Sequence, residues 1–163
     1  MRESVNALLD RIRTDLAEDW LPEIYRAKVR TQRTRAYLLD IVRAEDSPEI
    51  QYTLLGIELK LGKKRFSCPD LATARYIRVF ARLGCSEFAV PYDISKISRI
   101  ADELETSWQR SLLVAAGLTA RRPPRSAALI RRKLAARMRD EIAAIGAGEP
   151  MPAFDTKTRQ REK

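Results

Sequence analysis

The tripeptide Glu58-Leu59-Lys60 has the spacing that best suits catalytic chemistry in this chain. On a β-strand, the side chains of Glu58 and Lys60 point to the same face. Some metal-dependent nucleases use an acid and a lysine placed in this way to hold a divalent ion and activate water. A chain with 22 acidic residues is nevertheless expected to contain such a triplet by chance, and Asp155-Thr156-Lys157 is another. A nuclease is therefore the third hypothesis, behind two that need no catalysis.

The chain has few of the residues and motifs that other kinds of catalysis require. The chain has no histidine, which removes the commonest general base and metal ligand and excludes Ser-His, Cys-His and histidine–metal sites. Cys68 and Cys85 lack zinc-ligand spacing and are interpreted as two reduced thiols, with a redox pair as the alternative. No glycine-rich phosphate loop is present. We expect no catalytic residues, no bound metal, no cofactor and no enzymatic activity.

Positive charge is the strongest chemical signal in the sequence. The chain has 31 basic and 22 acidic residues, for a formal net charge of +9. The segment from Arg121 to Arg139 contains no acid, and its basic residues are Arg121, Arg122, Arg125, Arg131, Arg132, Lys133, Arg137 and Arg139. Concentrated basic charge is typical of polyanion binding, because neutralising phosphates releases condensed counterions. The alternative is a solvated helix face that maintains solubility.

A second basic group lies earlier in the chain. Its members are Arg75, Arg78 and Arg82, which share one face of a predicted helix, and Lys63, Lys64 and Arg65, which precede that helix. Arginine is well suited to bidentate phosphate contacts, so these residues are predicted to form a second nucleic-acid contact surface. A row of arginines on an outer helix face is as often solvated or paired with acids of a neighbouring element.

The elements that must position these residues begin with two predicted helices. Apolar residues recur at helical spacing from Glu3 to Asp19 and again from about Glu23 to Arg43. Together they predict a helical hairpin over residues 1–43. The segment from Ala44 to Glu49 is expected to be a loop, because it contains Asp46-Ser47-Pro48.

The middle of the chain has strand patterning. A strand is predicted over Ile50–Leu61, a turn at Gly62-Lys63-Lys64 and a return strand over Arg65–Cys68. Asp70 is the expected N-cap of a helix over Leu71–Leu83 that ends at Gly84, and a third strand is predicted over Cys85–Tyr92.

The C-terminal part is predicted to be helical. A long amphipathic helix is expected after Asp93, with Ile94 opening its apolar stripe, and its Leu112–Leu118 end is apolar on every side. That end is therefore expected deep in the core or at an interface between chains. Pro123 and Pro124 separate it from a helix over Ser126–Ile145, and the tail at 146–163 is predicted to be disordered.

The fold class that follows is α+β and mostly helical. It consists of the helical hairpin, a three-stranded β-β-α-β-α unit over residues 48–120, and a C-terminal basic helix over 121–145 after a proline hinge. A chain of 163 residues is typical of a single core. No apolar run reaches the length of a bilayer span, and no signal peptide is apparent.

The charge favours a partner over a reaction. The first hypothesis is a basic, non-enzymatic nucleic-acid-binding protein or complex subunit that contacts DNA or RNA phosphates, located in the cytoplasm or associated with the nucleoid. The alternative is a structural or adaptor subunit that binds a protein partner, or a second copy, through Leu112–Leu118 and the weak apolar stripe of the helix predicted from Glu23 to Arg43. No membrane partner is expected.

Overall fold

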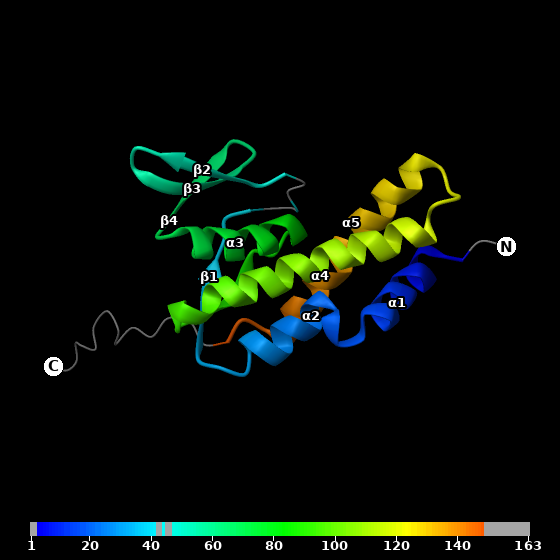
Figure 1. Cartoon of the computed structure of the whole chain (residues 1–163), viewed down its shortest axis with the longest axis horizontal. Coiled ribbons are helices and arrows are strands. Elements are labelled where there is room, and N and C mark those ends of the chain that lie inside the picture. The colour runs from blue at the N-terminus through cyan, green and yellow to red at the C-terminus, as the bar shows by residue number, and fades with distance from the viewer. Residues whose placement is uncertain (1–2, 42–43, 45–46, 149–163) are drawn as a thin grey trace.

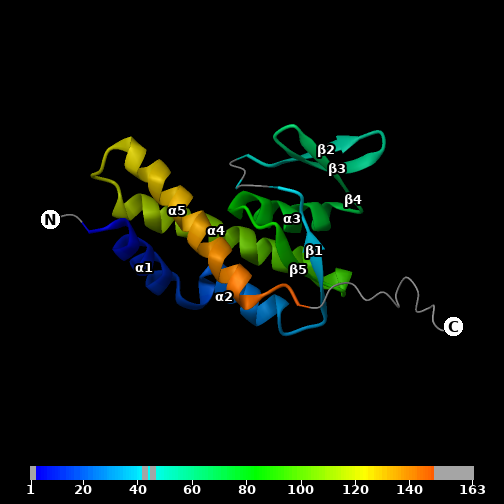
Figure 2. The ribbon, with the colours of Figure 1, turned by 180° about the vertical axis from the view of Figure 1, so that it is seen from behind.

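The computed structural model of the chain describes residues 3–41, 44 and 47–148. It confirms the predicted α+β class, with 59% of the chain helical and the strands in two small sheets. A long helix, α4 (Ile97–Leu118), runs through the centre of the molecule, with α5 (Pro124–Ile145) crossing it (Figures 1 and 2). A three-stranded sheet lies over α3 (Leu71–Leu83), away from the N-terminal helices.

The N-terminal helix forms much as its periodicity predicts. It comprises α1 (Val5–Leu16) and a short 3₁₀ turn, η1 (Ala17–Asp19). The Ser4 hydroxyl accepts a hydrogen bond from the Ala7 amide at 3.1 Å and so caps the first turn. The apolar face of α1 packs on α4 and α5. Among the described residues, no helix is both long and apolar enough to cross a membrane.

The predicted second helix over residues 23–43 is wrong in its extent. Helical structure is confined to α2 (Leu21–Ile24) and a π-helical turn, η2 (Tyr25–Val29). The chain then forms β1 (Thr34–Leu38), which pairs antiparallel with β5 (Glu87–Pro91). The reason is tertiary: β5 supplies the hydrogen bonds, and the ring of Phe88 packs 5.5 Å from that of Tyr37. The thin apolar stripe of this segment did not favour a helix strongly enough to outweigh that pairing.

The single strand predicted over Ile50–Leu61 is also wrong, because the chain reverses within it. The segment forms β2 (Glu49–Thr53) and β3 (Gly56–Leu61), joined by a turn at Leu54-Leu55. The Thr53 hydroxyl accepts from the Leu55 amide and donates to the Gly56 carbonyl, both at 3.1 Å. Gly56 has a φ of 124°, a value that favours glycine. This local hydrogen bonding makes the turn.

The predicted return strand is confirmed as β4 (Lys64–Cys68), and the sheet order is β2-β3-β4. The predicted third strand also forms, as β5. It pairs with β1 in a separate sheet instead of joining β3 and β4. The strands therefore form two sheets. In β2-β3-β4 the paired strands are adjacent in sequence, whereas in β1-β5 they are far apart in sequence.

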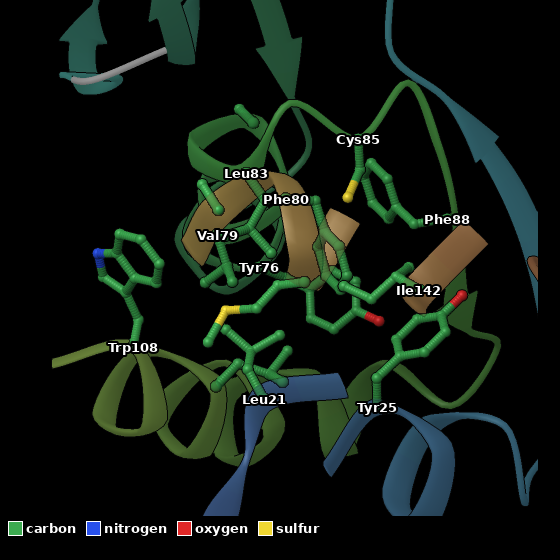
Figure 3. Packing of buried hydrophobic residues seen from close by; sticks show 14 of the residues in the cluster. Leu21, Tyr25, Tyr76, Val79, Phe80, Leu83, Cys85, Phe88, Trp108 and Ile142 are labelled. Carbon is green, nitrogen blue, oxygen red and sulfur yellow. The ribbon is translucent and has the colours of Figure 1, made fainter. Parts of the chain in front are cut away.

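Helix α3 lies where the sequence predicts it. The Asp70 carboxylate accepts from the Thr73 amide at 2.7 Å, and Gly84 ends the helix with a φ of 88°. Its buried face forms the centre of the core, where the rings of Phe80 and Phe88 stack with centroids 4.2 Å apart (Figure 3). Tyr25 packs edge-on against Phe80 at 5.7 Å, so the core joins α3, β5 and the π-helical turn.

Helix α4 begins after a 3₁₀ turn, η3 (Ile94–Lys96), which the Asp93 carboxylate caps by accepting from the Ser95 amide at 3.1 Å. Ile94 is 71% exposed, so it does not belong to the buried stripe as predicted. Of the two expectations for the Leu112–Leu118 end, a position deep in the core is wrong, since Leu113 is 72% exposed, and an interface between chains stays a prediction. Too few neighbouring elements reach this end of α4 to cover all its sides.

The predicted helix after the two prolines is confirmed as α5. Its buried residues, Ile130, Leu134, Ala135, Met138 and Ile142, recur at helical spacing. The Tyr25 hydroxyl ties the end of α5 to the core by donating to the Gly146 carbonyl at 2.7 Å and accepting from the Ala89 amide at 2.8 Å. Most of the predicted disordered tail, residues 149–163, lies outside the described residues.

Candidate nucleic-acid interface

A groove of about 1230 Å³ lies between the three-stranded sheet, the C-terminal end of α3, the middle of α4 and the outer face of α5. Its basic lining residues come from three elements and are Lys60, Arg82, Arg131, Arg132, Lys133 and Arg139. Glu49 is the only acid lining it within the described part of the chain. Basic side chains therefore outnumber acidic ones in the described lining, and Arg82 and Arg139 each have an acidic partner.

Apolar side chains form the bottom of this groove. Leu83 and Trp108 are almost fully buried, and Leu112 is half-buried beside them. Trp108 stands on α4 at the edge of the core, next to the α3 residues Val79 and Leu83 (Figure 3). Because Arg131, Arg132 and Lys133 are exposed while these groups are buried, the groove has an apolar floor and a basic rim.

Helix α5 supplies most of the rim because of how its sequence is divided between two faces. Leu129, Arg132, Lys133, Ala136 and Arg139 line the groove and recur at intervals of three and four residues, which places them on one side of the helix. Arg139, at the end of the acid-free segment, donates from Nε to the carboxylate of the adjacent Asp140 at 3.3 Å. Within the described ranges, Arg132 and Lys133 have no ion-pair partner.

Arg82 lies on the opposite side of the groove and is held there by an ion pair. Its Nη1 donates to both carboxylate oxygens of Glu105 on α4, each at 3.0 Å, and its side chain is 17% exposed. Gln109 Nε2 donates to the same carboxylate at 3.2 Å. Burial is the largest single influence on Glu105 and disfavours its ionisation, but the hydrogen bonds from Arg82 and Gln109 and the charges of Arg82 and Arg78 together outweigh it, so the pKa of Glu105 is lowered. Arg82 therefore has a fixed position.

The other two arginines of this helix do not line the groove. Arg75 forms an ion pair with Asp102 on α4. Arg78 lies between the two ion pairs, and its Nε is buried without a hydrogen-bond partner among the described residues. Burial lowers the pKa of Arg78, although a guanidinium stays charged at neutral pH. Arg75 and Arg82 are therefore paired with acids of the neighbouring helix α4, as the alternative interpretation of this arginine row predicts.

The basic residues of the β3–β4 turn also lie outside the groove lining. Lys63 is exposed, Lys64 pairs with Asp40 at 3.1 Å, and Arg65 lies 3.6 Å from the Glu58 carboxylate. Lys60, two residues before the turn, lines the groove instead. Sequence reasoning assigned Lys60 only to the nuclease motif and did not associate it with the basic surface.

The basic residues of the acid-free segment at 121–139 lie in different surroundings. Arg121 and Arg125 are exposed but lie outside the groove lining. Arg122 donates to the Glu3 carbonyl at 3.2 Å, and Arg137 pairs with Asp10 on α1. Arg139, the last residue of the segment, lines the groove. A helical-wheel projection alone would have separated Arg132 and Arg139 from Arg137.

The possible nuclease pair has the predicted placement on β3, and Glu58 is engaged by Arg65. Among the described residues, no group of three or more Cys, Asp or Glu side chains is arranged to hold a metal ion. Cys68 and Cys85 are buried free thiols, and burial raises the pKa of Cys85 to about 12.

Comparison of the chain with protein-family models, curated proteins and solved structures gives no match.

Proposed function

We propose that this protein is a non-enzymatic nucleic-acid-binding protein, or a subunit of a nucleic-acid-processing complex, that contacts phosphates through the basic groove. The observation that carries the proposal is the convergence of basic side chains from β3, α3 and α5 on one space lined by a single described acid, Glu49. Like charges repel, so such a convergence has a stability cost unless an anion occupies the space.

The kind of basic residue supports phosphate as that anion. Arginine presents a planar fork of donors that matches phosphate oxygens, and arginine predominates in the rim. Arg132 and Lys133 are exposed and without ion-pair partners in the described residues, so they are available to a ligand without breaking an internal contact. Each phosphate that they neutralise contributes through counterion release.

A pair of double variants tests this proposal. Arg132→Ala with Arg139→Ala removes two charges that line the groove, whereas Arg121→Ala with Arg125→Ala removes two charges that do not. Binding to fluorescently labelled DNA and RNA oligonucleotides is measured by anisotropy over a range of salt concentrations. The groove variant is expected to lower the slope of log K against log salt by about 2, because each lost contact removes about one released counterion.

The control variant has the same net charge and should keep a slope close to that of the parent. Equal slopes for the two variants would contradict a role for the groove. Absence of binding by the parent at about 50 mM salt would overturn the proposal altogether, since phosphate contacts are strongest at low ionic strength.

A second candidate function is that of a structural or adaptor subunit. Leu54 and Leu55 at the β2–β3 turn are 106% and 93% exposed, and Leu113 on α4 is 72% exposed. Exposed leucines held in a defined turn favour a protein partner. Light scattering and a hydrophobic dye test this candidate: a monomer that binds no dye would argue against it.

A further inference from the structure

We infer that the groove accepts single-stranded rather than double-stranded nucleic acid, with phosphates at the basic rim and bases against the apolar floor. This inference rests on the proposed function and adds the class of nucleic acid to it. It follows from the combination of two surfaces in one groove, which charge alone does not explain.

The first step concerns the floor. Leu112, Leu129 and Ala136 are partly exposed and give the floor its accessible apolar surface, whereas Leu83 and Trp108, at 1% and 3% exposed, offer a ligand little surface. Contact with an apolar surface does not stabilise the binding of a charged phosphate backbone. Such contact does stabilise the binding of unpaired bases, because their faces are apolar and gain by leaving water, as in protein channels that bind single strands.

The second step concerns the two sides of the groove. Lys60 and Arg82 approach from the sheet and α3, whereas Arg132, Lys133 and Arg139 approach from α5. A single strand lying between them can place phosphates against both sides while its bases reach the floor. A duplex keeps its bases stacked inside and presents phosphates on its exterior, so it would contact the rim and leave the floor without a partner.

The third step concerns size. A volume of about 1230 Å³ exceeds the roughly 300–1,000 Å³ of a typical small-molecule site. The groove therefore has room for a short stretch of one strand rather than for a single nucleotide.

An oligonucleotide series separates the contributions of the bases and the phosphates. The full-length protein is titrated with a thymidine decamer, an abasic decamer of the same charge and a duplex of the same length. If bases occupy the floor, the thymidine decamer should bind about tenfold or more tightly than the abasic one, which is the range of a single base contact. Equal affinities for the two decamers would overturn the inference.

A matched pair of variants locates the effect. Leu112→Gln places a polar group in the floor, whereas Leu113→Gln changes an adjacent residue that is 72% exposed and lies outside the groove lining. Leu112→Gln should weaken thymidine binding about tenfold with an unchanged salt slope, while Leu113→Gln should bind like the parent. Circular dichroism of both variants checks that they are folded.

The outcomes distinguish this inference from the proposed function. Salt-dependent duplex binding that is as tight as single-strand binding, and is weakened by the Arg132 and Arg139 substitutions, would refute the inference and keep the function. Binding of an acidic amphipathic peptide but of no oligonucleotide would refute both. Selective binding of the thymidine decamer, lost in Leu112→Gln alone, would support both.

Discussion

Arg82 and Glu105 form a two-pronged ion pair across the α3–α4 interface, with Arg82 Nη1 at 3.0 Å from each carboxylate oxygen. Their side chains are 17% and 25% exposed, which makes this pair far less accessible to water than the Arg75–Asp102 pair on the same interface, where Asp102 is 63% exposed. Partial burial strengthens the interaction and increases the penalty for removing one partner. This pair therefore both joins the two helices and fixes one side of the groove.

Replacement of Glu105 should destabilise the protein more than replacement of Asp102. Glu105→Gln leaves Arg82 without its counter-charge and is expected to lower the free energy of unfolding by about 1–3 kcal/mol. Asp102→Asn, at the exposed pair, should cost about 0–1 kcal/mol. Urea denaturation of both variants at pH 7 measures the difference, and equal losses would show that the burial of the Arg82–Glu105 pair does not matter.

The same ion pair predicts a loss of stability in acid. The pKa of Glu105 is lowered from its ordinary value of 4.5, so the folded state holds this carboxyl ionised where the unfolded state begins to take up a proton. The contribution is complete above about pH 4.5 and is lost as pH falls through the lowered pKa. The parent should therefore lose more stability than Glu105→Gln as pH falls below 4.5, as judged by denaturation midpoints, and parallel losses would contradict this assignment.

Tyr25 should make the protein sensitive to alkali. Burial raises the pKa of Tyr25 from 10.0 to about 12, so between these values the unfolded chain loses a proton that the folded chain keeps. The Tyr25 contribution to stability is complete below pH 10 and declines by roughly 2–3 kcal/mol as pH rises to 12. Tyr25→Phe should reduce stability at pH 8, because the Ala89 amide and the Gly146 carbonyl lose their partner, yet it should flatten the decline above pH 10.

Tyr52→Phe provides the control for that measurement, because Tyr52 is 71% exposed. Its denaturation midpoint should follow the parent at every pH. A Tyr25→Phe variant that declines as steeply as the parent above pH 10 would contradict the proposed role of Tyr25. Some decline should remain in the variant, since burial also raises the pKa of Tyr76.

Gly84 should tolerate no side chain. Its φ is 88°, and a Cβ built there would lie 2.8 Å from the Ala44 amide nitrogen. Gly84→Ala is therefore expected to cost about 1–3 kcal/mol through backbone strain and steric overlap. Gly117→Ala is a matched control within α4, where a Cβ meets nothing within 4 Å, and it should stabilise the protein by about 0.5–1 kcal/mol. Thermal melts of the two variants should shift in opposite directions.

Cys68 and Cys85 should react slowly with thiol reagents in the native protein. Both are buried, and burial raises the pKa of Cys85 to about 12, so little reactive thiolate is present at pH 8. Ellman's reagent should titrate both thiols rapidly in denaturant and slowly without it. Rapid reaction of the folded protein would show that these thiols are accessible, as a redox pair would require.

Local sequence signals determined several elements of this fold. Asp70 and Gly84 define both ends of α3, because a capping carboxylate and a left-handed glycine act within one turn of the helix. Pro123 and Pro124 separate α4 from α5 for an equally local reason. The β3–β4 hairpin belongs to the same class, since its strands are adjacent in sequence.

Only the tertiary structure decided what depends on distant segments. The residues of β1 have a weak local preference, and it is pairing with β5, about fifty residues later, that makes them a strand. The groove has the same origin. Composition revealed how much positive charge the chain carries, but the packing of α3, α4 and α5 decided that Arg82, Arg132 and Arg139 line one groove, whereas Arg75 and Arg137 lie outside it.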